Sequence, residues 1–214
     1  MNSTQIQRFE AIISGVNREG IDKLLEAVKK TDFYSAPAST RFHGSYDGGL
    51  LDHSLNVYDC LMVKKLSPIW QKVFTENNYT DDTLAISALL HDLCKTYFYV
   101  KDFKNQKTYD PDKVASAEGW QRKHDNNGDF IWETVPTYKI EDKFPYGHGE
   151  KSVMLIEQFV TLLPCERYAI RWHMGAYDCS PSQLNSIGSA IELYPLVLAL
   201  QEADQEATHL LETK

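Results

Sequence analysis

An adjacent histidine and aspartate end an apolar run in the segment SALLHDLCK, which covers positions 87–95. A buried imidazole or carboxylate costs about 1–3 kcal/mol or more unless it is hydrogen-bonded or bound to an ion. Successive residues differ by about 100° around a helix, so at a helix end His91 and Asp92 can both reach one ion. The pair therefore either solves a local structural problem or holds a metal.

Other polar residues of the same kind lie in segments that otherwise read as core helices. They are His53 in GGLLDHSLNV, His148 in PYGHGEKS, His173 in IRWHMGAYD and Asp204 in LALQEADQEA. Each alone is more simply explained as a hydrogen-bonded core residue, but their number favours a shared site. Imidazoles and carboxylates suit one or two divalent ions of Mn, Fe, Ni, Co or Zn better than a cysteine-type structural zinc site.

Several familiar catalytic motifs are absent from the printed sequence. It contains no HExxH, no EF-hand loop, no GxxxxGK[ST], no GxGxxG and no GxSxG. The cysteines show no CxxC spacing, and we expect small buried thiols in a reducing cytoplasm. These cysteines are Cys60, Cys94, Cys165 and Cys179.

The elements that must position these residues are mostly helical by their apolar periodicity. We expect helices within residues 3–31, over 50–66, from Thr80 or Asp81 to the histidine–aspartate pair, and over about 150–163, 165–174 and 189–214. The segment SAPASTRFHGSYDGG predicts a loop before the second of these helices.

The pattern changes between the histidine–aspartate pair and His148. TYFYV and DFIWETVPTYKI are aromatic and β-branched, and the second follows the turn signal DNNGD. The sequence therefore predicts a mainly α fold, a helical bundle with a small β-rich insertion at about residues 96–142. We expect one domain over 1–214, with a helical core at about 37–95 and 147–213 and N-terminal helices within 3–31.

Length and charge narrow the class further. A chain of 214 residues with 43% hydrophobic residues can bury a substantial core. Its net charge of −8 argues against a broad nucleic-acid-binding surface. No apolar run approaches the roughly 18 residues that span a bilayer, and the N-terminus lacks the features of a secretion signal, so we expect a cytoplasmic protein with no membrane partner.

The ordered motifs carry a family resemblance. The sequence resembles the HD-domain metal-dependent phosphohydrolases in five places, taken in order along the chain. These are FHGSYDGGLLDHSLNV, ALLHDLCK, GHGEKS, WHMGAYD and Asp204. The match is closest to the HD domain of the YhaM-type 3′-5′ exoribonucleases, although the printed sequence shows no OB-type domain and has a long insertion. The resemblance covers about residues 37–204 and implies an all-α core.

The resemblance also implies roles for the residues. His53, His91, Asp92 and Asp204 would bind a first ion, and His148 and His173 a second, with Asp92 bridging the two. Paired ions lower the pKa of a bridging water and stabilise charge on a phosphoryl oxygen.

Three further residues are candidates for substrate contact. Lys95 shares a face with the histidine–aspartate pair if the helix continues. We expect Asp92 and Lys95 to be catalytic, with the Lys95 ammonium in contact with a phosphate. The alternative is that Lys95 is a solvated helix-end lysine. Arg41 and His43 lie in a loop that can fold over the metals.

The insertion adds a charge signal that leaves two interpretations open. Residues 95–123 contain seven Lys or Arg and four acids, together with several aromatics. They form either a basic flap suited to a phosphorylated substrate or the packing face of a sheet beneath solvated lysines.

We expect a metal-dependent phosphohydrolase that acts on a nucleotide or another phosphorylated small molecule through a metal-activated water. One alternative is a 3′-5′ exonuclease on short single-stranded nucleic acid. Another is a regulatory or binding module with a structural metal.

Overall fold

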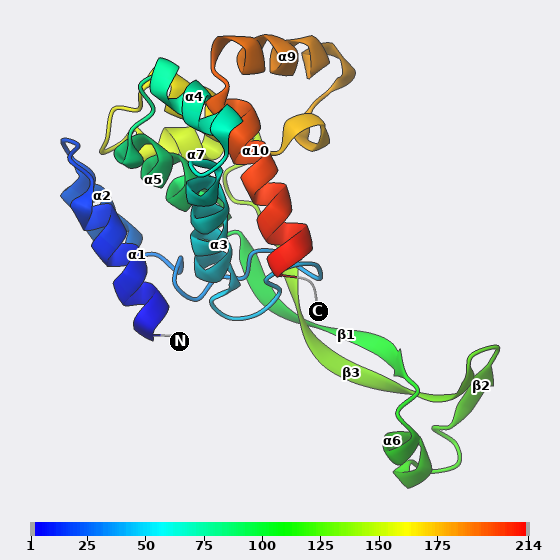
Figure 1. The fold of residues 1–214 in the computed structure, drawn as a ribbon. Coiled ribbons are helices and arrows are strands. Elements are labelled where there is room, and N and C mark those ends of the chain that lie inside the picture. The colour runs from blue at the N-terminus through cyan, green and yellow to red at the C-terminus, as the bar shows by residue number, and fades with distance from the viewer. Residues whose placement is uncertain (1–2, 213–214) are drawn as a thin grey trace.

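The computed structural model describes residues 3–212, and helices form most of its regular structure (Figure 1). The mainly α prediction is confirmed. The helices of the body are α1 (Ser3–Gly15), α2 (Ile21–Val28), α3 (Gly49–Lys64), α4 (Pro68–Glu76), α5 (Asp81–Leu90), α7 (His148–Ile156), α8 (Pro164–Trp172), α9 (Leu184–Leu193) and α10 (Leu196–Glu206). Short 3-10 turns lie at Leu93–Lys95, Gly175–Asp178 and Pro181–Gln183, and a π-type turn at Ala207–Leu211 follows α10.

Helices α3 and α5 lie at the centre because apolar side chains cover both of their sides. Leu55 of α3 and Leu89 of α5 pack in one hydrophobic cluster with α1, α2 and α7. Val57 and Ala88, which point in other directions from the same two helices, pack in a second cluster with α8 and α10. A helix that is apolar all round belongs in a core, so polar residues that α3 and α5 carry towards their neighbours become buried.

The ends of helix α5 are set by a side-chain cap at its start and a change of backbone conformation after its last residue. The Thr80 side chain accepts a hydrogen bond from the backbone of Thr83 and caps the first turn. The helix ends at Leu90, and Asp92 has backbone angles of φ −105° and ψ 19° before the 3-10 turn Leu93–Lys95. Helix α5 therefore does not continue to Lys95, as the sequence-based argument for that residue assumed.

Other departures from the expected elements have local causes. The single helix expected from residue 189 onward is two helices, because Pro195 lacks the N–H that a continuous helix needs. Helix α4 was not anticipated. No helix within residues 3–212 is both long and apolar enough to cross a lipid bilayer.

The β-rich insertion forms a ribbon that leaves the helical body (Figure 1). Its strands are β1 (Tyr99–Thr108), β2 (Lys123–Asp125) and β3 (Gly128–Ile140), in the order β1-β3-β2. Strands β1 and β3 are antiparallel from the pair Tyr99–Ile140 to the pair Thr108–Ile131. Strand β2 and the short helix α6 (Pro111–Ser116) lie at the far end.

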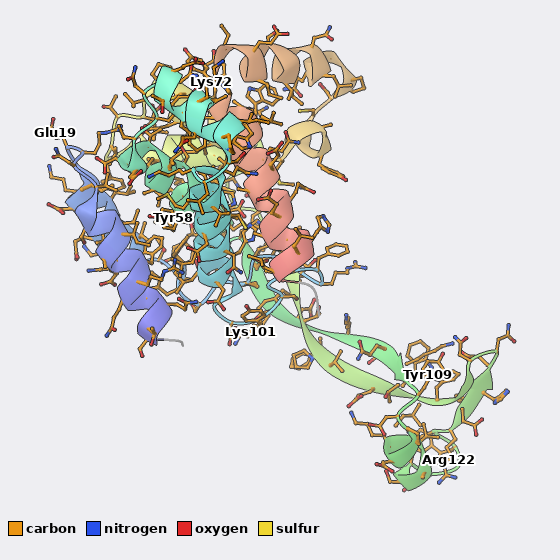
Figure 2. The ribbon with its side chains drawn as sticks, viewed as in Figure 1. Glu19, Tyr58, Lys72, Lys101, Tyr109 and Arg122 are labelled. Carbon is orange, nitrogen blue, oxygen red and sulfur yellow. The ribbon has the colours of Figure 1, made fainter. Side chains whose placement is uncertain are left out.

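The base of the ribbon rests on the loop that precedes α3. The Lys101 ammonium lies 2.8 Å from an Asp47 carboxylate oxygen, and the Tyr138 hydroxyl donates to the other oxygen at 2.6 Å. Figure 2 shows Lys101 near the body, whereas Tyr109 and Arg122 lie at the far end.

The charges of the ribbon cancel. Residues 99–140 contain seven Lys or Arg and seven Asp or Glu. Lys107 pairs with Asp125 at 2.5 Å, and Lys113 pairs with Glu133 at 2.7 Å. The positive segment identified in the sequence is therefore balanced by acids that follow it along the same ribbon.

We predict that the body folds without the outer ribbon, because that part extends away from both hydrophobic clusters. Replacing residues 105–134 by Asn-Gly joins the paired residues Lys104 and Val135 through a tight hairpin turn. The free energy of unfolding should change by less than about 1 kcal/mol, a shift of about 2–4 °C in the melting temperature. Thermal unfolding followed by circular dichroism measures this, and loss of a cooperative transition would contradict it.

Candidate metal centre

The structure brings the six predicted metal ligands together from separate elements. His53 comes from the middle of α3, and His91 and Asp92 follow the end of α5. His148 begins α7, His173 follows the end of α8, and Asp204 lies on α10. Five of these residues are at most 6% exposed: His53, His91, Asp92, His173 and Asp204.

The first group of donor atoms has separations that fit one coordination sphere. His53 Nε2 lies 3.2 Å from Asp204 Oδ1 and 3.6 Å from Asp92 Oδ2. His91 Nε2 lies 3.4 Å from the same Asp92 oxygen. Two nitrogen or oxygen donors, each about 2.1 Å from one ion at roughly 90–110°, lie about 3.0–3.4 Å apart. His53, His91 and Asp204 each offer one donor atom, and these atoms lie within 4.8 Å of one another, so these three residues can share an ion with little movement.

Two of the histidines present unpartnered nitrogen atoms to this cluster. The Nδ1 atoms of His91 and His173 lie 2.7 Å from the backbone oxygens of Ala88 and Ile170, respectively. A carbonyl only accepts, so each Nδ1 carries a hydrogen and each Nε2 is left to face the cluster. Both Nε2 atoms are buried and have no hydrogen-bond partner within the described residues. Metal-bound histidines are typically oriented in this way, so the residues fit a metal.

The Asp92 carboxylate lies between two groups of histidines. Its Oδ2 faces His53 and His91, whereas its Oδ1 is 2.7 Å from His148 Nε2 and 3.5 Å from His173 Nε2. Each oxygen can thus contribute to a different ion. This geometry suits the bridging role that the family resemblance implies for Asp92.

The charges around Asp92 keep it ionised. Burial raises the pKa of a carboxyl group, but the Lys95 cation and the neighbouring histidines outweigh this and hold the pKa of Asp92 well below its usual range. The pKa of Asp204 is also lowered, because the nearby histidines, His53 foremost, outweigh its burial. Two ionised carboxylates in a buried cluster attract a cation.

Lys95 is not a solvated helix-end lysine. It is 8% exposed, and its ammonium lies 2.6 Å from Asp92 Oδ2. Burial lowers the pKa of Lys95, but the charge of Asp92 outweighs this effect and raises it above the usual value. The 3-10 turn, rather than a continued helix, brings the ammonium back to Asp92.

Glu212 is a member of the cluster that sequence reasoning missed. Its two carboxylate oxygens lie 3.1 and 3.2 Å from His53 Nδ1, and Asn56 Nδ2 donates to one of them at 2.9 Å. Burial lowers the pKa of His53, yet the carboxylates of Asp204 and Glu212 raise it to about 9. A carboxylate behind a ligand histidine orients the ring and increases its basicity.

Cys94 was also missed as a neighbour of the site. Its Sγ lies 3.3 Å from His148 Nδ1 and 3.6 Å from His148 Nε2. Burial raises the pKa of the Cys94 thiol to about 12, so this thiol is not an activated nucleophile. Cys94 and Cys165 are buried, whereas Cys60 and Cys179 are half-buried.

The two loop candidates for substrate contact differ in their positions. The His43 ring lies 4.9 Å from the His53 ring, and its Nε2 is buried without a hydrogen-bond partner within the described residues. Burial lowers the pKa of His43 to about 4, and the nearby His53 adds to the effect. Arg41 is exposed on the same loop.

A comparison with curated proteins gives one relative of known activity. The dihydroneopterin 2′,3′-cyclic phosphate phosphodiesterase of Methanocaldococcus jannaschii is 35% identical over 75 residues. The match covers 35% of this chain and only 28% of that protein. No family model matches the chain, and no solved structure matches it. The chain is thus similar to a phosphodiesterase over about a third of its length.

We predict that Glu212 strengthens metal binding through His53. Glu212→Ala should weaken the binding of a divalent metal by about 10–100-fold, the usual cost of losing such a partner. Competition with a chelator of known affinity measures this. Glu202→Ala is a matched control, because Lys64 keeps its second partner Glu206. Equal affinities in the two variants would contradict a positioning role for Glu212.

We also predict that Lys95 stabilises the fold. Lys95→Met leaves the Asp92 carboxylate buried without its cation, which should reduce the free energy of unfolding by about 3–5 kcal/mol in the presence of chelator. Chemical denaturation measures the change. Lys101→Met removes an exposed ion pair and should cost less than about 1 kcal/mol. A Lys95 variant as stable as the Lys101 variant would show that the buried pair contributes little.

Proposed function

We propose that this protein is a metal-dependent phosphohydrolase of the HD superfamily that cleaves a phosphodiester bond in a nucleotide or another phosphorylated small molecule. The observation that carries the proposal is the pair of buried Nε2 atoms of His91 and His173, which lack hydrogen-bond partners and lie 3.4–3.5 Å from opposite oxygens of Asp92. A structural core would be expected to satisfy such atoms.

Each residue of the cluster has a role in this proposal. His53, His91, Asp92 and Asp204 hold one ion, and Asp92 with His148 and His173 holds the other. When bound, divalent ions lower the pKa of a coordinated water and stabilise negative charge on a phosphoryl oxygen. Glu212 orients the His53 ring through the Nδ1 hydrogen bond.

Lys95 and the loop before α3 face the substrate in this proposal. An ammonium has three donors, so Lys95 keeps its hydrogen bond to Asp92 and offers another to a phosphoryl oxygen. His43 lies beside His53 at the edge of the cluster, and the exposed Arg41 is two residues away on the same loop. A guanidinium at that position suits a phosphate of the bound substrate.

A small substrate fits the charge distribution better than a polymer. The ribbon has no net charge, and Lys101, Lys107 and Lys113 are already paired with carboxylates. A strand of nucleic acid needs several cations that are free to bind successive phosphates. The similarity to an enzyme named for a cyclic phosphate supports the same choice.

We predict metal-dependent hydrolysis that depends on the cluster. The protein, supplied with Mn²⁺, Fe²⁺, Co²⁺, Ni²⁺ or Zn²⁺, should hydrolyse at least one member of a panel of cyclic and linear phosphodiesters, nucleotides and short oligonucleotides. His91→Ala and Asp92→Ala should reduce kcat/KM by more than about 100-fold, beyond the usual cost of losing an outer partner.

The exposed histidine His124 gives a matched control, because it pairs with Asp129 on the ribbon away from the cluster. His124→Ala should retain full activity. An active His91→Ala protein, or a wild type that binds metal tightly but hydrolyses nothing in the panel, would overturn the proposed activity. Degradation of single strands in preference to small diesters would show that the substrate class is wrong.

A further inference from the structure

We propose that Cys94 is a ligand of the second ion, which it shares with Asp92 and His148, so that this ion occupies a site containing sulfur. The inference rests on the proposed metal-dependent function and deepens it. It adds a thiolate to a centre that the sequence indicated to contain only imidazoles and carboxylates.

The donor atoms of these three side chains already lie close together. Cys94 Sγ is 3.6 Å from His148 Nε2, and the same Nε2 is 2.7 Å from Asp92 Oδ1. One atom from each side chain can be chosen so that all three lie within 4.8 Å of one another. When one ion binds a sulfur at about 2.3 Å and a nitrogen at about 2.0–2.1 Å, with a near-tetrahedral angle at the ion, the sulfur and the nitrogen lie about 3.5 Å apart. The observed distance from Sγ to Nε2 matches this value.

A fourth candidate donor lies near the same carboxylate oxygen. His173 Nε2 lies 3.5 Å from Asp92 Oδ1, the oxygen that also contacts His148. It is buried and has no hydrogen-bond partner within the described residues. With Cys94, Asp92 and His148, this nitrogen gives a candidate set of two imidazole nitrogens, one carboxylate oxygen and one sulfur, a mixed set that suits a transition metal.

The backbone holds Cys94 in place independently of any ion. Residues two apart point to nearly opposite sides of an α-helix, about 200° apart, so a continued helix would separate Cys94 from Asp92. The chain instead leaves the helix at Asp92 and forms a 3-10 turn. The Cys94 N–H then donates to Ser152 Oγ on α7 at 3.0 Å. Helix α7 begins with His148, so this bond fixes the thiol beside that ring.

The proton balance of the site is consistent with thiolate binding. The 2.7 Å contact with Asp92 fits an Nε2–H donor on His148, and in that tautomer Nδ1 can accept from the Cys94 thiol 3.3 Å away. When an ion binds, the Nε2 proton leaves to solvent and the Sγ proton passes to Nδ1. One proton is released, and the thiolate and the neutral imidazole each offer a lone pair. A thiolate favours Zn²⁺, Fe²⁺ or Co²⁺ over Mn²⁺ or Mg²⁺ at this position.

Cobalt substitution tests the inference directly. The full chain is loaded with Co²⁺, its cobalt content is measured by elemental analysis, and its absorption spectrum is recorded. Cobalt bound by a thiolate absorbs in the near ultraviolet by sulfur-to-metal charge transfer, whereas nitrogen and oxygen ligands alone give only weaker visible bands. We expect the charge-transfer band in the wild type and its loss in Cys94→Ser, with the cobalt content falling by about half.

Two further variants assign the band. Cys165→Ser removes another buried thiol, which lies in the second hydrophobic cluster, and should keep the band. A variant with Cys60→Ser, Cys165→Ser and Cys179→Ser leaves Cys94 as the single thiol and should also keep it. This variant decides the question if Cys94→Ser fails to fold, because a missing band there overturns the inference.

The possible failures are distinguishable. If the wild type binds cobalt but shows no charge-transfer band, the inference that Cys94 binds the ion is wrong, and the proposed function is unaffected. The same holds if the band persists in Cys94→Ser. A wild type that binds no cobalt overturns both the ligand and the metal-dependent function.

Discussion

The burial of the Asp92 carboxylate at the end of α5 is the interaction on which the site depends. A charged carboxylate that is 1% exposed is stable only if cations or hydrogen-bond donors surround it. Lys95 provides one cation, and His53, His91, His148 and His173 provide nitrogens from four other positions in the chain. The helices that carry these residues must therefore pack against one another for Asp92 to remain ionised.

Helix α5 makes this arrangement possible because it is the most enclosed helix of the body. Its residues are buried from Thr83 to Leu90, so its C-terminal end opens inside the protein rather than at the surface. Helices α3, α8 and α10 line that interior end with His53, His173 and Asp204, respectively. The hydrophobic clusters on either side of α3 and α5 thus hold the candidate ligand set rigid, as a metal centre requires.

The sequence predicts the helical class, and His53, His91 and Asp204 interrupt apolar stripes that indicate their burial, whereas the expectation that His148 and His173 join the same site came from the family resemblance. His53 and Asp204 are examples, because their helical neighbours are typical of a core. It does not predict Cys94, which approaches His148 only because a 3-10 turn replaces the last helical turn. Glu212 is similarly hidden, because a π-type turn after α10 changes the helical period before it reaches His53.

The environment of charged side chains is the other property that sequence patterns do not resolve. Lys95 could be read as solvated or as a ligand, and only the structure shows that it is buried against Asp92. The basic half of the ribbon could be interpreted as a flap for phosphates, but in the fold Lys107 pairs with Asp125 of β2 and Lys113 with Glu133 of β3. Both distinctions depend on contacts between residues distant in sequence.

The central claim is that Asp92 joins two metal ions. Anomalous diffraction from crystals of the protein grown with Mn²⁺ or Co²⁺ tests it most directly. We predict two anomalous peaks within coordination distance of Asp92, one shared with His53, His91 and Asp204, and the other with His148 and His173. The account would be contradicted if well-diffracting crystals at saturating metal showed no peak beside Asp92. Metal bound only at exposed carboxylates would contradict it as well.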